Sequence, residues 1–321
     1  MADFPKFVEF HEEGPREGFQ IEKTIYPIEK RVEFLNLLSE TGLKQIQVGS
    51  MVNPKKVPPM ADTPEVFRRI NKKPGVHYTA LWLNKQGFLR AAELPGLHLE
   101  GNLYFYASDA LAHANNDRPA EQMRLEQLEF VQLYEQHKVP IGAANIMCAF
   151  GCNMEGEISP NKVTDLIPWI REITVGRGHK MPAIYLADTM GWCNPERMKR
   201  LIGAVRNVAP EARIGTHIHD TRGLGMANVY AALEMGVDLF DSSVAGLGGC
   251  PFASHKHANA AGNVCTEDAV FMCHELGIKT GIDLDKLIEA ARFVEGMMGR
   301  SLTGKIMHSG SLSAYRRKAA E

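Results

Sequence analysis

Short apolar runs rich in β-branched and aromatic residues alternate with longer stretches of helical periodicity along the whole chain. This alternation is typical of repeated βα units whose strands form a parallel sheet. The runs that fit strands are 7–12, 45–48, 78–83, 97–106, 141–148, 183–187, 213–219 and 239–244. The pattern therefore predicts eight strands.

The segments between these runs have the apolar spacing of amphipathic helices, and several begin at a capping residue or Pro and end near Gly. The predicted helices are 28–41, 64–71, 120–137, 160–174, 195–208, 226–235 and 267–276. The link at 84–94 is shorter, 282–298 is a final helix, and 300–321 is a polar tail.

Eight βα units in about 250 residues have the size of a closed (β/α)₈ barrel. A doubly wound open sheet is the alternative arrangement. No Pro-, Gly- or Ser-rich linker divides the chain. We therefore expect an α/β protein with one TIM-barrel domain over 1–321, its barrel at about 6–278 and an additional C-terminal helix and tail over 279–321.

The composition is that of an ordinary globular protein, with 45% apolar residues, 23% charged residues and a formal net charge of -2. It provides no basic field for nucleic acid. No apolar run approaches ~18 residues, and Met1 is followed by no secretory pattern. The six cysteines are scattered, as free thiols in a reducing compartment would be. We expect a soluble, cytoplasmic protein without nucleic-acid or membrane partners.

Polar residues follow several of the predicted strands, at the end of a TIM barrel where the chemistry takes place. They are Glu13 to Gln20 after the first strand, Asp188 after the sixth, His217 to Asp220 at the seventh, and Ser242 to Cys250 at the eighth.

His217 and His219 are two residues apart on a predicted strand, so both rings point to the same side of the pleat. Two imidazoles and an oxygen donor commonly bind a divalent metal while leaving positions open for substrate. The alternative is a pair of histidines that form hydrogen bonds in the core.

The glycine-rich segment 242–251 carries Cys250 and permits backbone conformations closed to other residues. It predicts a movable loop over the site, although glycine turns are common and lone cysteines are often inert. Cys148 and Cys152 have a spacing that does not match a zinc knuckle, so we interpret them as structural or pocket-lining.

Segments 14–20, 216–221 and 241–251 together resemble 3-hydroxy-3-methylglutaryl-CoA lyase, as do 52–55, 262–263 and 266–268. The similarity extends from about residue 7 to residue 300. The loop with Cys250 is its most specific part, because the histidine pair is shared with isopropylmalate and homocitrate synthases.

The resemblance implies a divalent metal, Mg²⁺ or Mn²⁺, and a retro-Claisen cleavage of a 3-hydroxy-3-substituted acyl-CoA to acetyl-CoA and a keto acid. The implied metal ligands are Glu17, His217, His219 and Asn263. Arg16 would bind the thioester carbonyl and stabilise the enolate.

A retro-Claisen mechanism at this site also predicts roles in proton transfer and binding. His217 or Asp188 would be the general base, and Cys250 would protonate the enolate carbon. Expected substrate contacts are Gln20, Gln47, Arg222, Gly248 and Gly249. Lys55, Arg300 and Lys305 are candidates for the CoA phosphates, although solvated surface charge explains them equally well.

The chain departs from the resembled lyase at several positions. Glu17 replaces the usual Asp, Gln47 replaces the usual Glu, and Arg222 replaces an aromatic residue. The loop before Asn263 is longer and adds His255, Lys256 and His257, which are either solvated or close on the substrate. These differences favour a substrate acid that is more anionic or bulkier than 3-hydroxy-3-methylglutarate.

Two other functions remain open. A synthase would run the opposite condensation of acetyl-CoA with an α-keto acid, and it would share the histidine pair and Arg16. A non-catalytic acyl-CoA or metal-binding homologue is the other alternative. We expect acyl-CoA as the partner molecule and a homodimer or higher homo-oligomer.

Overall fold

The computed structural model describes residues 4–249, 262–313 and 315–316 of the 321-residue chain. Eight parallel strands form its main sheet. They are β1 (Glu9–Glu12), β2 (Gln45–Ser50), β3 (His77–Leu81), β4 (Gly101–Tyr106), β5 (Ile141–Met147), β8 (Ala183–Asp188), β9 (Ile214–Ile218) and β10 (Leu239–Ser242). All the predicted strands are confirmed, with ends that differ by a few residues.

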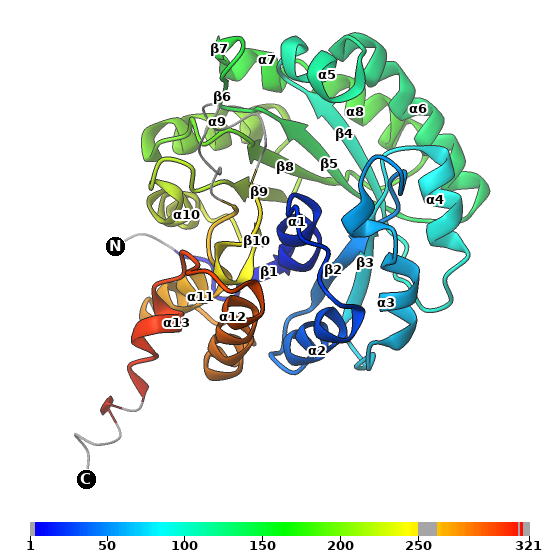
Figure 1. The fold of residues 1–321 in the computed structure, drawn as a ribbon. Helices are drawn as coiled ribbons and strands as arrows, with labels where there is room; N and C mark the ends of the chain where they lie inside the picture. The colour runs from blue at the N-terminus through cyan, green and yellow to red at the C-terminus, as the bar shows by residue number, and fades with distance from the viewer. Residues whose placement is uncertain (1–3, 250–261, 314, 317–321) are drawn as a thin grey trace.

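The strands follow the order β3-β2-β1-β10-β9-β8-β5-β4. β1 pairs with β10, so the first strand of the chain lies beside the last, and the ring of strands surrounds a central axis (Figure 1). A doubly wound sheet would instead reverse its strand order at a switch point. The strand order therefore confirms the predicted barrel arrangement.

The barrel has a seam between β3 and β4, which are not joined by a strand ladder. Side chains of a neighbouring helix form hydrogen bonds with two backbone groups of β4 at this seam. The Tyr104 amide donates to Gln127 Oε1 at 2.9 Å, and the Tyr134 hydroxyl donates to the Asn102 carbonyl at 3.1 Å. The Trp82 indole N–H in turn donates to the Tyr134 hydroxyl at 2.8 Å.

Helices cover the outside of the barrel (Figure 1). They are α2 (Ile28–Ser39), α3 (Thr63–Arg69), α4 (Lys85–Ala92), α5 (Asp109–Asn116), α6 (Ala120–Gln136), α7 (Pro160–Thr164), α8 (Ile167–Ile173), α9 (Pro195–Val208), α10 (Gly225–Glu234), α11 (Thr266–Glu275) and α12 (Leu284–Met298). The predicted final helix is confirmed as α12. The short link at 84–94 is the helix α4, which Asn84 caps by accepting from the Gly87 amide at 2.8 Å.

Several features differ from the sequence prediction, and one of them is helix α5, which the sequence pattern did not predict. The predicted helix 160–174 is two helices, α7 and α8, because Pro168 in the first turn of α8 has no amide hydrogen to continue the preceding helix. A helix, α1 (Gly14–Gln20), follows β1 directly and lies over the middle of the strand ring in Figure 1. The polar tail contains the short helix α13 (Ile306–Ser309).

The remaining elements are small. A two-stranded hairpin pairs β6 (Gly151–Cys152) with β7 (Gly156–Glu157). Single 3₁₀ turns are η1 (Pro58–Met60), η2 (Val175–Arg177) and η3 (Val244–Gly246).

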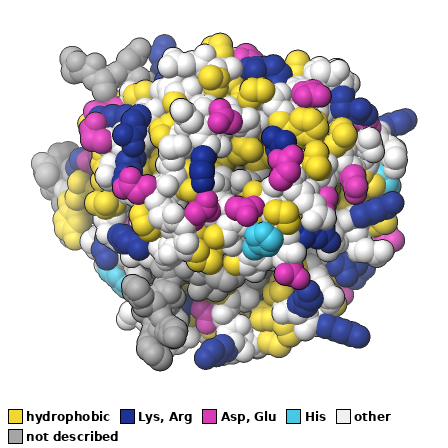
Figure 2. All heavy atoms as spheres, turned by 90° about the horizontal axis from the view of Figure 1, so that it is seen from above, with side chains coloured by type: hydrophobic (Ala, Val, Ile, Leu, Met, Phe, Trp, Pro, Cys, Tyr) yellow, Lys and Arg dark blue, Asp and Glu magenta, His cyan; other side chains and the backbone are white. Residues whose placement is uncertain are grey.

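The surface mixes charges of both signs. Figure 2 shows Lys, Arg, Asp and Glu side chains interspersed with apolar ones on the face seen from above. Among the described residues, none of the helices has the length and apolar character needed to span a lipid bilayer.

Candidate active site

Helix α1 is held over the barrel mouth by the buried carboxylate of Glu12, at the end of β1. Glu12 accepts hydrogen bonds from the Gly14 amide at 2.8 Å, the Val244 amide at 2.9 Å and the Thr266 hydroxyl at 2.6 Å. Pro15 lies in the first turn of α1, where its missing N–H has no helical partner to lose. These bonds connect α1 to η3 and α11 and fix the direction in which its side chains point.

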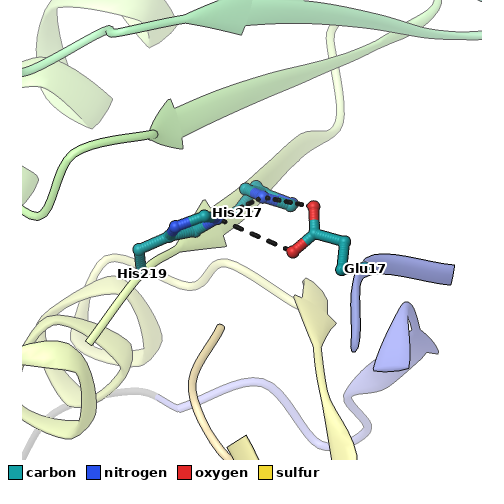
Figure 3. Close-up of side chains that lie close together, drawn as sticks. All are labelled: Glu17, His217 and His219. Carbon is teal, nitrogen blue, oxygen red and sulfur yellow. Dashed lines mark hydrogen bonds and ion pairs between the residues drawn. The ribbon is translucent and has the colours of Figure 1, made fainter. Parts of the chain in front are cut away.

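Three potential metal ligands meet at this mouth. Glu17 on α1 faces His217 and His219 at the end of β9 (Figure 3). The two histidine Nε2 atoms are 3.1 Å apart, and the Glu17 carboxylate oxygens lie 3.5 Å from His217 Nε2 and 3.7 Å from His219 Nε2. The ligand atoms of the three residues all lie within 4.8 Å of one another.

This geometry fits a divalent ion. An imidazole nitrogen binds an ion such as zinc at about 2.1 Å, so neighbouring ligand atoms on one ion stand about 3 Å apart, close to the separation of the two Nε2 atoms. Asn263 pairs with His219 in a β-bridge and donates its amide N–H to Glu17 Oε2 at 2.8 Å. Its Oδ1 is buried without a hydrogen-bond partner in the described part of the chain. That oxygen is suited to be a further ligand.

Electrostatics favour a carboxylate at this point. Burial opposes ionisation of Glu17, but Arg16 and the two histidines outweigh it and lower the Glu17 pKa to about 2. Burial also opposes protonation of His217, but Glu17 and Asp241 raise its pKa to about 9. Burial lowers the pKa of His219 to about 4, and the positive charges of His217 and Arg16 act in the same direction.

Asp241 orients one of the two imidazoles. Its Oδ2 lies 2.9 Å from Nδ1 of His217, which turns Nε2 of that ring toward Glu17. Carboxylates in this position commonly fix the tautomer and direction of metal-binding histidines. Asp241 was not predicted as a site residue from the sequence. Its contact with His217 depends on the register in which β10 pairs with β9, which places Asp241 opposite His217.

Arg16 lies between the candidate metal ligands and the barrel wall. Its guanidinium contacts Glu13 Oε2 at 2.7 Å and Glu17 Oε1 at 3.0 Å, and its Nε donates to Gln47 Oε1. Burial raises the Glu13 pKa to about 7 despite the Arg16 charge. Glu13, which the sequence placed only at a strand end, is thus part of the arrangement that holds Arg16.

The family of this chain is identified by comparison with known proteins. A family model described as HMGL-like matches residues 7–294. The chain belongs to the HMGL-like family. Human cytoplasmic 3-hydroxy-3-methylglutaryl-CoA lyase is 37% identical over 95% of this chain and 79% of its own length. The mitochondrial hydroxymethylglutaryl-CoA lyase of Gallus gallus is 37% identical over 94% of this chain and 97% of its own.

Solved structures show the same relationship. Hydroxymethylglutaryl-CoA lyase from Pseudomonas aeruginosa superposes with a TM-score of 0.84 at 35% identity, over 99% of both chains. An HMG-CoA lyase from Acinetobacter baumannii, solved with coenzyme A and 3-methylmalate, has a TM-score of 0.84 at 37% identity over 98% of both chains. The carboxyl transferase domain of Rhizobium etli pyruvate carboxylase shares the fold alone, at 16% identity and a TM-score of 0.67.

In this HMGL-like barrel, two predicted site residues, Asp188 and Arg222, form hydrogen bonds with the loop after β8. The Asp188 carboxylate accepts from the Trp192 amide at 2.7 Å and the Cys193 amide at 3.1 Å, and burial raises its pKa to about 6. The Arg222 guanidinium donates to the Met190 carbonyl at 2.6 Å and lies over the Trp192 ring. Both side chains are therefore anchored beside the mouth.

The glycine loop approaches the metal ligands from β10. Gly248 has a φ of 99°, and a Cβ atom at this position would lie 2.9 Å from the Glu17 Cβ, so only glycine allows this approach. Gly249 is the last described residue before the gap. The predicted residues Cys250, His255, Lys256 and His257 lie outside the described residues.

The other predicted contacts are more distant or more exposed. Gln20, at the end of α1, has a buried Oε1 without a hydrogen-bond partner among the described residues. Lys55 and Lys305 are exposed, and Arg300 forms an ion pair with Glu22 at 2.7 Å. The structure does not bring these three cations together with the metal ligand set.

Cys148 and Cys152 are buried in a cluster with Leu111 and Met190. Their predicted role as structural or pocket-lining residues stays a prediction.

Proposed function

We propose that this protein is a divalent-metal-dependent lyase that cleaves a 3-hydroxy-3-substituted acyl-CoA into acetyl-CoA and a keto acid. The observation that carries the proposal is the convergence of Glu17, His217 and His219 with the guanidinium of Arg16 in contact with Glu17. The similarity to hydroxymethylglutaryl-CoA lyases across almost the whole chain supports the same reaction class.

The reaction breaks the bond between C2 and C3 of the acyl group. Its electron pair moves to C2 as an enolate, the C3 hydroxyl loses its proton, and C3 becomes the carbonyl carbon of the keto acid. A divalent ion such as Mg²⁺ or Mn²⁺, when bound, would supply Lewis acidity to the C3 hydroxyl. We infer that Glu17, His217, His219 and Asn263 hold that ion.

Arg16 is suited to bind the thioester oxygen, which becomes negative in the enolate. Its charge is permanent, and the Glu13, Glu17 and Gln47 contacts fix its position before substrate arrives. A donor that needs no reorganisation during the reaction stabilises developing charge most effectively.

Of the two predicted bases, the surroundings favour Asp188. His217 directs one ring nitrogen toward the metal position and the other toward Asp241, which leaves no nitrogen for the substrate proton. The Asp188 oxygens accept backbone hydrogen bonds but keep further lone pairs, and a pKa of about 6 suits proton transfer near neutral pH. We retain Cys250 as the donor that protonates the enolate carbon.

The proposed partner is an acyl-CoA, with Lys55, Arg300 and Lys305 as candidate phosphate contacts and with a homo-oligomer as the proposed assembly. The relatives include cytoplasmic and mitochondrial enzymes, and we propose the cytoplasm for this chain.

Product analysis tests the proposed reaction. The metal-stripped protein, supplied with Mg²⁺ or Mn²⁺, is incubated with a panel of 3-hydroxyacyl-CoA esters, and the products are identified by mass spectrometry. We expect acetyl-CoA and the keto acid in equal amounts. Condensation of acetyl-CoA with an α-keto acid would favour a synthase. CoA-ester binding without any product would favour a non-catalytic homologue.

A further inference from the structure

The interior of the barrel is hollow below the metal ligands. A TIM barrel normally fills this space with layers of large branched side chains. In this protein a cavity of about 540 Å³ extends from Glu9 and Arg213, where strands begin, to Glu17 and His217 at the mouth. That volume lies within the range of about 300–1,000 Å³ typical of ligand pockets.

The charges that line the upper part of this cavity are already paired. Arg16 contacts Glu13 and Glu17, and His217 contacts Asp241. A carboxylate that entered the cavity would therefore find no unpaired positive charge among these residues. It would also be repelled by the carboxylates of Glu13, Glu17 and Asp241.

The cavity wall also carries neutral polar groups that have no partner. Thr79 Oγ1 is buried without a hydrogen bond in the described part of the chain. Within the same described residues, neither the Tyr104 hydroxyl nor the Gln47 amide nitrogen takes part in a hydrogen bond. An alkyl group against this wall would leave these groups buried and unpaired, which is unfavourable.

The position of the metal ligands determines which part of a substrate enters the cavity. Glu17 and His217 line its upper end, so the carbon that bears the metal-bound hydroxyl lies at that end. The CoA portion is far too large for the barrel and must extend through the mouth. C3 carries two further carbon substituents, one with the carboxylate and one uncharged. Because Arg16 and His217 are already paired with acidic groups, the uncharged substituent is the one that suits the barrel interior.

We propose that the hollow barrel accepts a C3 substituent that is several atoms longer than methyl and carries an uncharged hydrogen-bonding group such as a hydroxyl. This inference rests on the proposed lyase function and specifies its substrate class. Gln47, Thr79 and Tyr104 bind the polar end of that substituent. The cavity explains a bulkier substrate, and its paired charges argue against a more anionic substituent.

Three CoA esters test the inference with the metal-loaded full chain. They are 3-hydroxy-3-methylglutaryl-CoA and two analogues in which 3-hydroxypropyl or butyl replaces the methyl group. The last two have substituents of equal heavy-atom number and differ in one hydroxyl. We expect kcat/KM for the hydroxypropyl-substituted CoA ester to exceed kcat/KM for each of the other two CoA esters by about tenfold or more. A site that binds a hydroxyl group rejects analogues that lack it.

Tyr104→Phe and Thr79→Val remove the proposed partners without changing the shape of the wall. Each variant should lower the ratio of kcat/KM for the hydroxypropyl-substituted CoA ester to kcat/KM for the butyl-substituted CoA ester by about tenfold. Tyr230→Phe, a tyrosine that is 38% exposed on α10, is the matched control and should leave the ratio unchanged.

The outcomes separate the two proposals. The substituent inference is wrong, and the lyase proposal stands, if 3-hydroxy-3-methylglutaryl-CoA is cleaved as well as or better than the hydroxypropyl-substituted CoA ester. The same holds if the butyl-substituted CoA ester is cleaved as well as the hydroxypropyl-substituted one. A ratio unchanged in both variants also overturns the inference. If none of the esters is cleaved with Mg²⁺ or Mn²⁺, both proposals fail.

Discussion

Glu17 is the residue whose position most directly links the sequence to chemistry. Its side chain meets Arg16, both histidines and Asn263, and the charges of Arg16 and the two histidines lower its pKa. Helix α1 begins directly after β1, and this position brings the Glu17 carboxylate, one methylene longer than Asp, to 3.5 Å from His217 Nε2 and 3.7 Å from His219 Nε2.

Glu17→Gln should weaken Mn²⁺ binding by about tenfold or more, because a neutral amide replaces the only carboxylate among the proposed ligands. Isothermal titration of the metal-stripped protein measures the affinity. Glu29→Gln, an exposed glutamate on α2, is the control. Equal affinities in wild type and Glu17→Gln would exclude Glu17 as a ligand.

Asp241→Asn should weaken Mn²⁺ binding by about 10–100-fold, although Asp241 lies outside the ligand set. Asparagine keeps the size of the side chain but no longer stabilises the His217 N–H with a full charge. The same titration checks it, with circular dichroism to confirm the fold. An unchanged affinity would mean that His217 is oriented by its backbone alone.

The sequence allowed part of this site to be predicted at the residue scale. His217 and His219 followed from their spacing on a strand, and Glu17, Arg16 and Asn263 followed from family resemblance. Asp241 and Glu13 could not be predicted in this way. The contact of Asp241 depends on the strand register and that of Glu13 on the course of α1, and local periodicity encodes neither the register nor that course.

At the scale of elements, hydrophobic periodicity predicted all the barrel strands and most helices. It did not predict α1, because Gly14-Pro15 and Gly18 are typical of a loop and the helix is held by Glu12 through long-range bonds. It also could not show that β3 and β4 lack a ladder, since an apolar run carries no information about which edge is paired.

Tyr134→Phe tests how α6 closes that seam. The variant leaves the Trp82 N–H and the Asn102 carbonyl without the hydroxyl that joins them, which should lower the free energy of unfolding by about 1–3 kcal/mol. Urea denaturation measures the change, with Tyr230→Phe as the control. A loss within error of the control would show that the hydroxyl does not stabilise the seam.

At the scale of the whole molecule, several buried carboxyl groups make stability depend on pH. Glu267, at the start of α11, is fully buried, accepts one bond from the Ala245 amide at 3.0 Å and has an Oε1 with no partner among the described residues. Burial raises its pKa from an ordinary value of 4.5 to about 8. The folded state therefore binds this proton more tightly than the unfolded state does.

Glu267→Gln should reveal this contribution. In the wild type the stabilisation is complete below pH 4.5 and is lost as the pH rises toward about 8. The glutamine variant lacks this loss, so its advantage in free energy of unfolding should grow over that interval to on the order of a few kcal/mol. Denaturation at a series of pH values measures it, with the exposed Glu289→Gln as the control. A constant difference across pH would contradict the prediction.

We propose that a carbon–carbon bond is broken at the candidate metal centre formed by Glu17, His217 and His219. The most direct measurement is the rate of acetyl-CoA release from 3-hydroxyacyl-CoA esters as Mn²⁺ is added back to metal-stripped wild type and Glu17→Gln. We expect no release in EDTA, a saturable rise with Mn²⁺, and a curve displaced to about tenfold higher Mn²⁺ or beyond in the variant. Release that is independent of metal, or identical curves for the two proteins, would contradict the proposal.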